Sequence, residues 1–314
     1  MKVVVTGGAG FIGANLCKNL CQQSFVDRVA VLDDLSTGTL ENLHDVPVAL
    51  HEGSILTDND IDAVMAEADA VVHLAARPSV PRSLFDPIAT HLANATGTLM
   101  VLEGARRHGV KHVVVASSSS VYGASRELPK RENAAPLPVS PYAASKLATE
   151  AYALSYGHSF GLPVLVFRFF NVFGPLQSAG HAYAAVVPTF ITCALADIPL
   201  PVHGDGTQTR DFTFVDTVVT VLTEAVRRRV TSPTAVNLAS GTRVSLLELI
   251  SSLERVLGRD LPVEHCEPRS GDVRDSLADL TELQQLFPRF RPTALDEGLR
   301  TTLRWFEDMR IDAA

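Results

Sequence analysis

The sequence predicts an α/β protein whose core is a doubly wound parallel sheet, followed by a smaller C-terminal α/β part. Two observations lead to this prediction. Short runs rich in valine alternate with longer amphipathic segments through the first half of the chain, which is typical of strands buried on both faces by helices. After residue 170 the alternation loosens, and the length of 314 residues allows about two domains.

The predicted elements follow one another in a regular order. Strands are expected at residues 2–6, 28–33, 46–52, 70–75, 111–117, 163–169 and 235–239, where apolar and β-branched residues cluster. Helices are expected at residues 11–22, 57–67, 87–108, 212–229, 245–257 and 295–309, and one more begins at residue 141. Asp86-Pro87 and Ser140-Pro141 are typical helix starts, because a polar side chain caps the helix and proline suits its first position. Residues 171–185 and the turn at 204–206 are expected to be loops.

Charge and composition exclude several classes of function. The 27 basic and 35 acidic residues leave a formal net charge of −8, so neither nucleic acid nor an anionic membrane is an expected partner. No segment approaches the ~18 consecutive apolar residues of a membrane span, and the first apolar run is too short for a signal peptide. The four cysteines form no CxxC pair, so we expect a reduced, cytoplasmic protein without a metal site, in which Cys17 and Cys21 pack in the core.

A glycine-rich turn at residues 6–13 directly follows the first predicted strand and opens the first predicted helix. In that context Gly7 permits a tight turn, Gly10 lets the backbone approach a pyrophosphate, and Gly13 lets the helix pack closely on the sheet. The helix N-terminus offers unpaired N–H groups to the phosphates. Asp33 ends the second strand, 20 residues after Gly13, where a carboxylate accepts hydrogen bonds from ribose hydroxyls and repels a 2′-phosphate. The sequence therefore predicts NAD, rather than NADP, as the cofactor.

Tyr142 and Lys146 are four residues apart, which puts both side chains on one face of the helix that starts at residue 141. A free phenol has a pKa near ~10, and a nearby ammonium favours the ionised form that acts as a base. Residues 117–120 are four serines at the carboxyl end of a predicted strand, where open α/β sheets bind ligands. We expect a serine there to relay a proton between a substrate hydroxyl and Tyr142.

The sequence resembles the extended short-chain dehydrogenase/reductase family, and within it the NAD-dependent nucleotide-sugar epimerases and dehydratases, over essentially the whole chain. The segments that carry this resemblance are TGGAGFIG at 6–13, LDDLSTG at 32–38, HLAA at 73–76, NATGT at 94–98, SSSSVYG at 117–123, SPYAASK at 140–146, RFFNVFGP at 168–175, QTRDFTFVD at 208–216 and PRSGDVRDSLAD at 268–279. The resemblance implies a Rossmann domain of residues 1–171 with about 212–240, a smaller substrate domain of residues 172–211 and 241–314, and a homodimer.

The resemblance also assigns roles to individual residues. The chemistry would be performed by Ser118, Tyr142 and Lys146. NAD would be bound by Gly7, Gly10, Phe11, Ile12, Gly13, Asp33, Asp34, Ser36, Thr37, Gly38, Ser54, Ile55, Leu74, Ala75, Ala76, Asn94, Tyr142, Lys146 and Phe169. A UDP-sugar substrate would be bound by Ser79, Ser118, Ser119, Tyr142, Asn171, Val187, Arg210, Arg269 and Ser276.

Three serines bear on the reaction and on the sugar. Relatives that dehydrate or decarboxylate a sugar typically carry acidic residues in place of Ser119 or Ser120, because elimination needs an acid and a base. The two hydroxyls here favour a 4-epimerase, which forms a transient 4-keto sugar and inverts C4. Relatives restricted to glucose and galactose carry a tyrosine at the position of Ser276. The smaller serine implies that UDP-N-acetylglucosamine and UDP-N-acetylgalactosamine are accepted as well as UDP-glucose and UDP-galactose.

Three other functions stay open from the sequence. One is a UDP-glucuronate 4-epimerase, in which Arg77 or Arg82 meets the sugar carboxylate. Another is a nucleotide-sugar lyase, either a dehydratase or a decarboxylase. The third is a non-catalytic NAD-binding protein, which is disfavoured because such proteins commonly lose the Tyr142–Lys146 pair.

Overall fold

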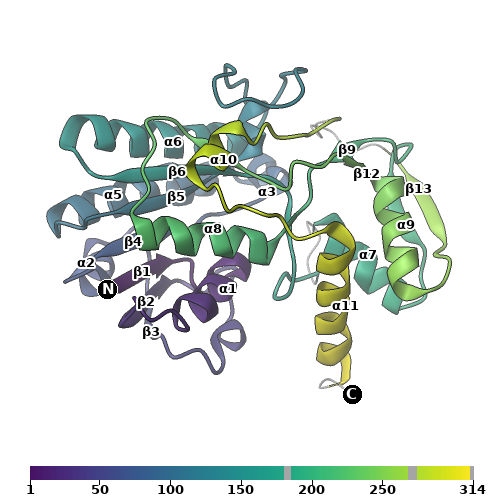
Figure 1. Cartoon of the computed structure of the whole chain (residues 1–314), viewed down its shortest axis with the longest axis horizontal. Helices are drawn as coiled ribbons and strands as arrows, with labels where there is room; N and C mark the ends of the chain where they lie inside the picture. Colours follow the sequence, from purple (N-terminus) through teal and green to yellow (C-terminus); the bar gives the residue numbers. More distant parts are fainter. Residues whose placement is uncertain (180–184, 268–273, 312–314) are drawn as a thin grey trace.

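A seven-stranded parallel sheet forms the centre of the molecule, in the strand order β11-β6-β5-β4-β1-β2-β3 (Figure 1). The computed structural model describes residues 1–179, 185–267 and 274–311. The strands of this sheet are β1 (Lys2–Thr6), β2 (Arg28–Asp33), β3 (Ala49–Glu52), β4 (Ala70–His73), β5 (Val113–Ser118), β6 (Val164–Phe169) and β11 (Val236–Leu238). The strand order reverses its direction between β1 and β4. In sheets of this kind ligands bind at the carboxyl ends of the strands beside that reversal.

Helices cover both faces of the sheet (Figure 1). They are α1 (Phe11–Leu20) and α8 (Val215–Arg228) on one face, and α2 (Asp58–Met65), α5 (Gly97–Arg107) and α6 (Pro141–Phe160) on the other. Successive strand side chains point to opposite faces, so Val3 and Val5 belong to the core under α1 and α8, whereas Val4 belongs to the core under α2, α5 and α6. This burial on both faces explains why the strands are nearly uninterrupted apolar runs.

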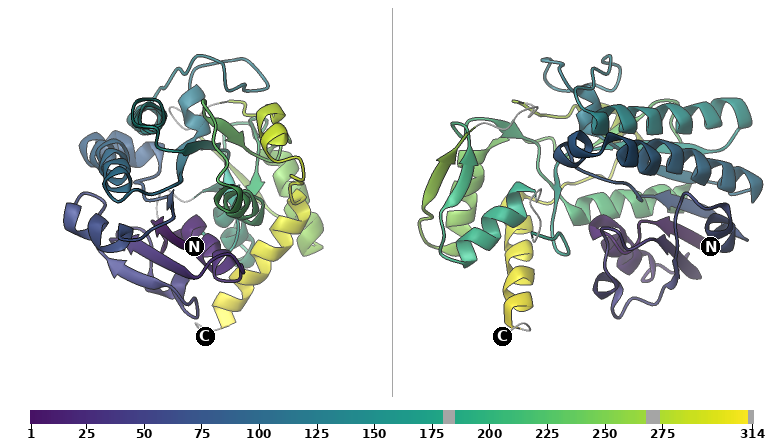
Figure 2. Two further views of the ribbon diagram at one scale, coloured as in Figure 1. Left: turned by 60° about the vertical axis from the view of Figure 1, so that its left-hand side comes forward. Right: turned by 180° about the vertical axis from the view of Figure 1, so that it is seen from behind.

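A second group of elements lies beside the carboxyl ends of the sheet (Figures 1 and 2). It consists of β7 (Val172–Phe173), α7 (Val186–Leu195), β8 (Leu200–His203), β9 (Thr209–Arg210), β10 (Thr213–Phe214), β12 (Val244–Ser245), α9 (Leu246–Leu257), β13 (Val263–Cys266) and α11 (Leu295–Ile311). The pairs β10–β7, β12–β9 and β13–β8 form two-stranded sheets, and the short α10 (Thr281–Leu286) returns to contact β11. Over the three described ranges, no helix combines the length and the apolarity of a membrane span, and no cluster of three or more His, Cys, Asp or Glu could hold a metal ion.

The structure confirms the predicted strands and helices, with shifted ends and one interruption. The helix expected at 87–108 consists of α4 (Pro87–His91), a π-helical turn (Leu92–Thr96) and α5. Its carbonyl at Asn94 accepts hydrogen bonds from the hydroxyls of Thr98 and Thr149, which compete with the regular helical pattern. The helix expected from residue 212 begins at Val215, because the two preceding residues pair with β7 as β10.

Several short elements have no signal in the sequence periodicity. They are α3 (Val80–Phe85), two 3₁₀ turns (Leu40–Leu43 and Ser119–Tyr122), α7, α10 and the strands β7–β10, β12 and β13. Most of them are too short to show a helical or alternating pattern. Cys17, on the buried face of α1, is fully buried as expected, whereas Cys21 is only half-buried.

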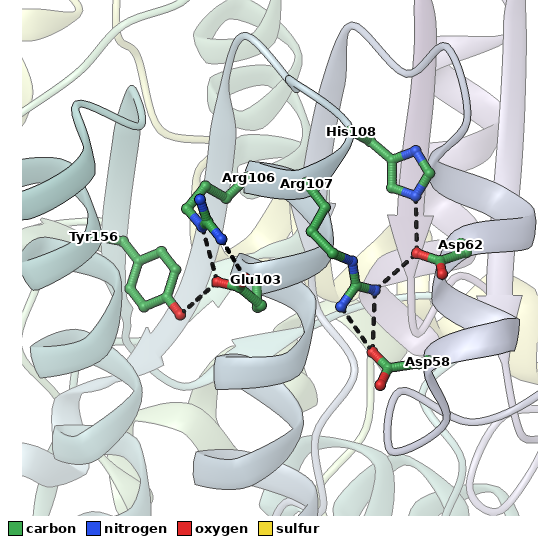
Figure 3. A network of polar contacts seen from close by, with 7 residues as sticks. All are labelled: Asp58, Asp62, Glu103, Arg106, Arg107, His108 and Tyr156. Atoms are coloured by element: carbon green, nitrogen blue, oxygen red, sulfur yellow. Dashed lines mark hydrogen bonds and ion pairs between the residues drawn. The ribbon is translucent and has the colours of Figure 1, made fainter.

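A network of ion pairs on the outer surface joins three of the helices on one face of the sheet (Figure 3). Arg107 at the end of α5 donates to Asp58 and Asp62 of α2 at 2.8 to 3.0 Å, and His108 also contacts Asp62. Glu103 of α5 accepts hydrogen bonds from Arg106 and from Tyr156 of α6. The carboxylates lie near the surface, so each pair contributes little on its own, and the network mainly fixes how the helices align.

Candidate active site

In the glycine turn between β1 and α1, two glycines are packed against backbone atoms and a third, Gly10, faces open space. Gly7 has φ +73°, and a Cβ there would lie 2.6 Å from the backbone N of Ala75. A Cβ on Gly13 would overlap the carbonyl oxygen of Gly7. A Cβ on Gly10 would meet nothing closer than that same oxygen at 3.3 Å, and Gly10 caps α1 without a side-chain hydrogen bond. The first N–H groups of α1, including those of Phe11 and Ile12, therefore face an open cradle suited to an anion.

Two alanine substitutions separate the packing role of this turn from its binding role. Gly13→Ala is expected to destabilise the protein by about 1–3 kcal/mol, because its methyl group has no space. Gly10→Ala is expected to keep the melting temperature but to weaken NAD binding at least about tenfold, because its methyl group fills the cradle. Thermal unfolding and a fluorescence titration with NAD measure the two effects. Unchanged NAD affinity in Gly10→Ala would contradict the assignment of the cradle.

Asp33, at the end of β2, organises the loop that follows it. Its carboxylate accepts the N–H of Ala9 at 2.8 Å and the N–H of Leu35 at 2.9 Å. Burial raises the pKa of this carboxyl, and the two hydrogen bonds oppose the shift. Gly38 lies against the backbone of Ala9, where a Cβ would come within 2.6 Å of its carbonyl carbon. The predicted cofactor residues Asp34, Ser36, Thr37 and Gly38 therefore form one loop folded onto the glycine turn, with the Ser36 N–H and hydroxyl both bonded to Asp34.

The remaining predicted cofactor residues follow other strands of the sheet at the same edge. Ser54 and Ile55 follow β3, the three residues Leu74, Ala75 and Ala76 follow β4, and Phe169 ends β6. Asn94 lies in the π-helical turn, where its side chain is already occupied by protein groups: its oxygen accepts the N–H of Arg77 at 2.7 Å, and its nitrogen donates to Ser145 at 2.9 Å. Asn94 thus ties the loop after β4 to the helix α6.

A buried chain of hydrogen bonds runs beneath these residues from β1 to the π-helical turn. Thr98 donates to the carbonyl of Asn94, so it accepts a hydrogen bond from Nε2 of His73 at 3.0 Å. Nδ1 of His73 is then the acceptor for the hydroxyl of Thr6 at 2.7 Å. Burial, together with the charge of Lys146, lowers the pKa of His73 to about 3, so the ring is neutral and its tautomer is fixed.

The three predicted catalytic residues come together where β5 ends and α6 begins. Ser140 caps α6 by accepting the N–H of Ala143 at 3.1 Å, and this fixes the first turn, on which Tyr142 lies. The hydroxyl of Ser118 is close enough to the phenol of Tyr142 to lower its pKa. The same hydroxyl oxygen accepts the N–H of Ser120 at 3.2 Å, which holds Ser118 in place. Predicted substrate residue Ser119 begins the 3₁₀ turn that follows Ser118.

Burial favours the uncharged form of both titratable groups of the site. It raises the pKa of Tyr142, and the hydrogen bond from Ser118 opposes that shift. It lowers the pKa of Lys146 to about 8, while the Glu150 carboxylate acts in the opposite direction. The Lys146 ammonium donates to the carbonyl of Ala116 on β5 at 2.9 Å. Both shifts oppose ionisation, so a phenolate at Tyr142 needs a positive charge close by, which the ammonium of Lys146 can supply.

The predicted substrate residues lie mostly on the second group of elements. Ser79 caps α3 with the strained φ of +95°, and Asn171 donates to the carbonyl of Asp211 at 3.3 Å. Val187 is buried at the start of α7, and Arg210 ends β9. The N–H of Ser276 donates to Thr209 at 3.1 Å. Arg269 lies outside the described residues.

Three buried charged residues near the site were not singled out from the sequence. Asp211 accepts hydrogen bonds from Ser240, Gly241 and Ala278, and thereby joins three segments around the predicted substrate residues. Glu150 and Arg168 form an ion pair beneath Lys146. The signal that could have found Glu150 is its spacing, four residues after Lys146 on the same helix.

Comparisons with known proteins agree with this geometry. The model of the NAD dependent epimerase/dehydratase family matches residues 3–239. The UDP-glucose 4-epimerase of Mycolicibacterium smegmatis is 35% identical over 314 residues, covering 98% of this chain and 99% of that protein. The dTDP-glucose 4,6-dehydratase of Streptomyces griseus is also 35% identical, over 98% of this chain and 94% of that protein. A solved UDP-N-acetylglucosamine 4-epimerase from Methanobrevibacter ruminantium, in complex with UDP-N-acetylmuramic acid, superposes with a TM-score of 0.92 at 34% identity and 98% coverage of both chains.

Proposed function

Because the chain belongs to the NAD-dependent epimerase/dehydratase family, we propose that it is a UDP-sugar 4-epimerase acting on UDP-glucose and UDP-galactose, and on UDP-N-acetylglucosamine and UDP-N-acetylgalactosamine. The observation that carries the proposal is the Ser118–Tyr142–Lys146 cluster, set beside the glycine turn with serines at positions 119 and 120. Sequence identity does not separate an epimerase from a dehydratase, since one relative of each kind is 35% identical. The side chains favour an epimerase, because two hydroxyls cannot readily serve as the acid and base of an elimination.

The residues present fit NAD. The open side of Gly10 and the uncapped N-terminus of α1 suit a pyrophosphate, and Asp33 stands at the end of β2, where a ribose hydroxyl would meet it. Bound there, NAD would supply the reversible oxidation of the sugar carbinol, with no net redox change.

In the proposed mechanism the side chains bind the substrate and move one proton. Tyr142, as the phenolate, takes the proton of the sugar 4-hydroxyl and later returns it, and Ser118 shares the hydrogen bond between them. The Lys146 ammonium stabilises the phenolate from the same helix face. Asn171, Arg210 and Arg269 would hold the diphosphate while the 4-keto sugar turns its opposite face toward the site.

A UDP-glucuronate 4-epimerase is less well supported. The guanidinium of Arg77 already pairs with Asp86 at 3.3 Å, so it is engaged within the protein rather than offered to a sugar carboxylate. No observation on the described residues favours glucuronate over a neutral hexose.

The experiment that tests the function is incubation with a panel of UDP-sugars, followed by NMR of the products. Inversion at C4 with an unchanged product mass supports the 4-epimerase. Loss of water or CO₂ would instead show a lyase, and turnover of UDP-glucuronate alone would show the alternative epimerase. A cytoplasmic location stays a prediction.

We also propose that the protein is a homodimer, and an apolar patch on α3 and α4 supports this. Phe85 is 85% exposed and Ile88 is 71% exposed, with Leu84 and Leu92 beside them in the chain. Both helices pack against α6, so the patch adjoins the helix that carries Tyr142. Exposed apolar groups gathered in this way are typical of a protein interface.

Charging this patch is expected to break the dimer. Ile88→Asp should give a monomer in sedimentation velocity, because a carboxylate would be buried in the interface without a partner. Ile198→Asp is the matched control, since Ile198 is 50% exposed but lies in the turn after α7. A dimer that persists in Ile88→Asp would contradict the location of the interface, and a monomeric wild-type protein would contradict the dimer itself.

A further inference from the structure

A buried ion pair lies directly beneath the face of α6 that carries Tyr142 and Lys146. Glu150, one helical turn after Lys146, accepts hydrogen bonds from Nε and Nη2 of Arg168, each at 2.9 Å. The two side chains are 4% and 7% exposed. The hydroxyl of Ser117 also donates to the Glu150 carboxylate. The carboxylate is therefore held by side chains from two neighbouring strands, β5 and β6.

These contacts fasten α6 to the sheet at two successive turns. Lys146 is held by the carbonyl of Ala116, and Glu150 by the next residue of β5 and by Arg168 of β6. A buried ion pair rarely adds stability over apolar residues of the same volume, because both charges lose their hydration. Its presence in this core, one turn from the ammonium of the site, therefore indicates an electrostatic role.

We propose that Glu150 is a positioning residue for Lys146. The carboxylate of Glu150 keeps the Lys146 ammonium charged, and the guanidinium of Arg168 neutralises the charge of that carboxylate. The inference rests on the proposed function, in which the charge of Lys146 supports the Tyr142 phenolate. Arg168 has two further contacts that fix its guanidinium: it donates to the carbonyl of Glu132 at 3.3 Å and lies 4.7 Å from the centre of the Tyr122 ring.

The groups that face Lys146 come from four elements. They are Tyr142 and Glu150 on α6, the Ala116 carbonyl on β5, His73 on β4 and, through Glu150, Arg168 on β6. His73 is neutral across the range in which Lys146 titrates, because its pKa is lowered to about 3. Glu150 is therefore the charged group that acts on the ammonium, and Arg168, which is bonded to Glu150, carries the opposite charge.

The opposite signs give the proposal a sharp test. In Glu150→Gln the uncompensated Arg168 charge should lower the titration midpoint of Lys146 by about one pH unit. In Arg168→Gln the uncompensated carboxylate should raise it, and in the double variant the midpoint should return close to that of the wild-type protein. Arg168→Lys, which keeps the charge without the two-pronged hydrogen bond, should leave it nearly unchanged.

The measurement is competitive labelling with trace acetic anhydride from pH 6 to 11, with the Lys146 peptide quantified by mass spectrometry and exposed Lys18 as the internal reference. The pH profile of kcat/KM with UDP-glucose is recorded for the same proteins, and its alkaline limb should move with the labelling midpoint. If the ion pair served packing alone, both single variants would have a lower melting temperature. The labelling midpoint and the alkaline limb would then not move in opposite directions in the two variants. Midpoints that stay fixed, or that move the same way in both single variants, would overturn the proposal.

The two readouts separate this inference from the proposed function. Labelling needs no turnover, so it decides the role of Glu150 even if the protein proves not to be an epimerase. Should Glu150→Gln not fold, the Arg168→Gln and double variants still decide, because the proposal requires an upward shift in the first and its reversal in the second. Midpoints that move while the alkaline limb stays fixed would count against the role proposed for Lys146, not against the contact between the charges.

Discussion

Replacing Tyr142 by phenylalanine is expected to lower kcat for 4-epimerisation by about 10²- to 10⁴-fold, the usual contribution of a positioned acid–base group. The change removes only the hydroxyl, whose pKa is affected by the neighbouring hydroxyl of Ser118. NAD binding and the melting temperature should therefore change little. The measurement is a coupled assay of UDP-galactose conversion, together with thermal unfolding of the same preparation.

A second tyrosine on the same helix provides the control. Tyr156→Phe removes a hydroxyl that donates to Glu103 at 3.0 Å on the outer surface, far along α6 from Ser118. Its activity should remain within about twofold of wild type, because the change removes only the hydrogen bond to Glu103 and leaves the buried ring in place. A Tyr142→Phe variant that keeps more than about a tenth of wild-type kcat would contradict the role proposed for the phenol.

Ser276→Tyr is expected to remove activity on UDP-N-acetylglucosamine while sparing UDP-glucose. The backbone at this point is held on both sides, since the Ser276 N–H donates to Thr209 and the Ala278 N–H donates to Asp211 at 3.1 Å. The backbone around residue 276 therefore cannot move to accommodate a larger side chain. The tyrosine would take the space that the acetamido group of the sugar needs. The expected loss in kcat/KM is about 100-fold for the acetamido sugar, as for a methyl or larger group forced into a packed site.

The sugar panel for this variant is compared with that for Ser276→Ala, which keeps the position small and should process both sugars. Equal losses on both sugars in Ser276→Tyr would indicate a folding defect, to be checked by thermal unfolding. Unchanged turnover of UDP-N-acetylglucosamine would show that Ser276 does not limit the sugar.

The sheet could be predicted from the sequence because each strand is buried on both faces. A run such as that of β1 has polar residues only at its two ends and shows no alternation, and few other arrangements accommodate it. Helix starts were predictable where the sequence contains a capping residue followed by proline, as at Ser140-Pro141. The π-helical turn at Leu92–Thr96 was not, because it depends on hydroxyls of Thr98 and Thr149 that reach the turn from two directions.

The candidate site was predictable to the extent that its residues lie in local motifs. The four-residue spacing of Tyr142 and Lys146 and the serines ending β5 are visible in the sequence, and the structure brings Ser118 and Tyr142 into contact. The pairing of Glu150 with Arg168 and the contacts of Asp211 with Ser240 and Ala278 were not predictable in this way, because the partners lie on other strands and loops. The division into two domains and the roles of the substrate residues stay predictions.

The hydrogen-bonded chain through His73 makes the protein acid-labile. The pKa of this imidazole falls from its ordinary 6.5 to about 3 on folding, so between these values the unfolded chain holds a proton that the native one excludes. Native stability therefore diminishes as pH falls below 6.5, by up to about 1.4 kcal/mol per pH unit, and is unaffected by this group above 6.5. A proton on Nδ1 also abolishes the acceptor for Thr6, whose strand leads into the glycine turn. Acid near pH 3 should therefore disturb the strand that leads into the glycine turn, in addition to lowering the stability of the fold.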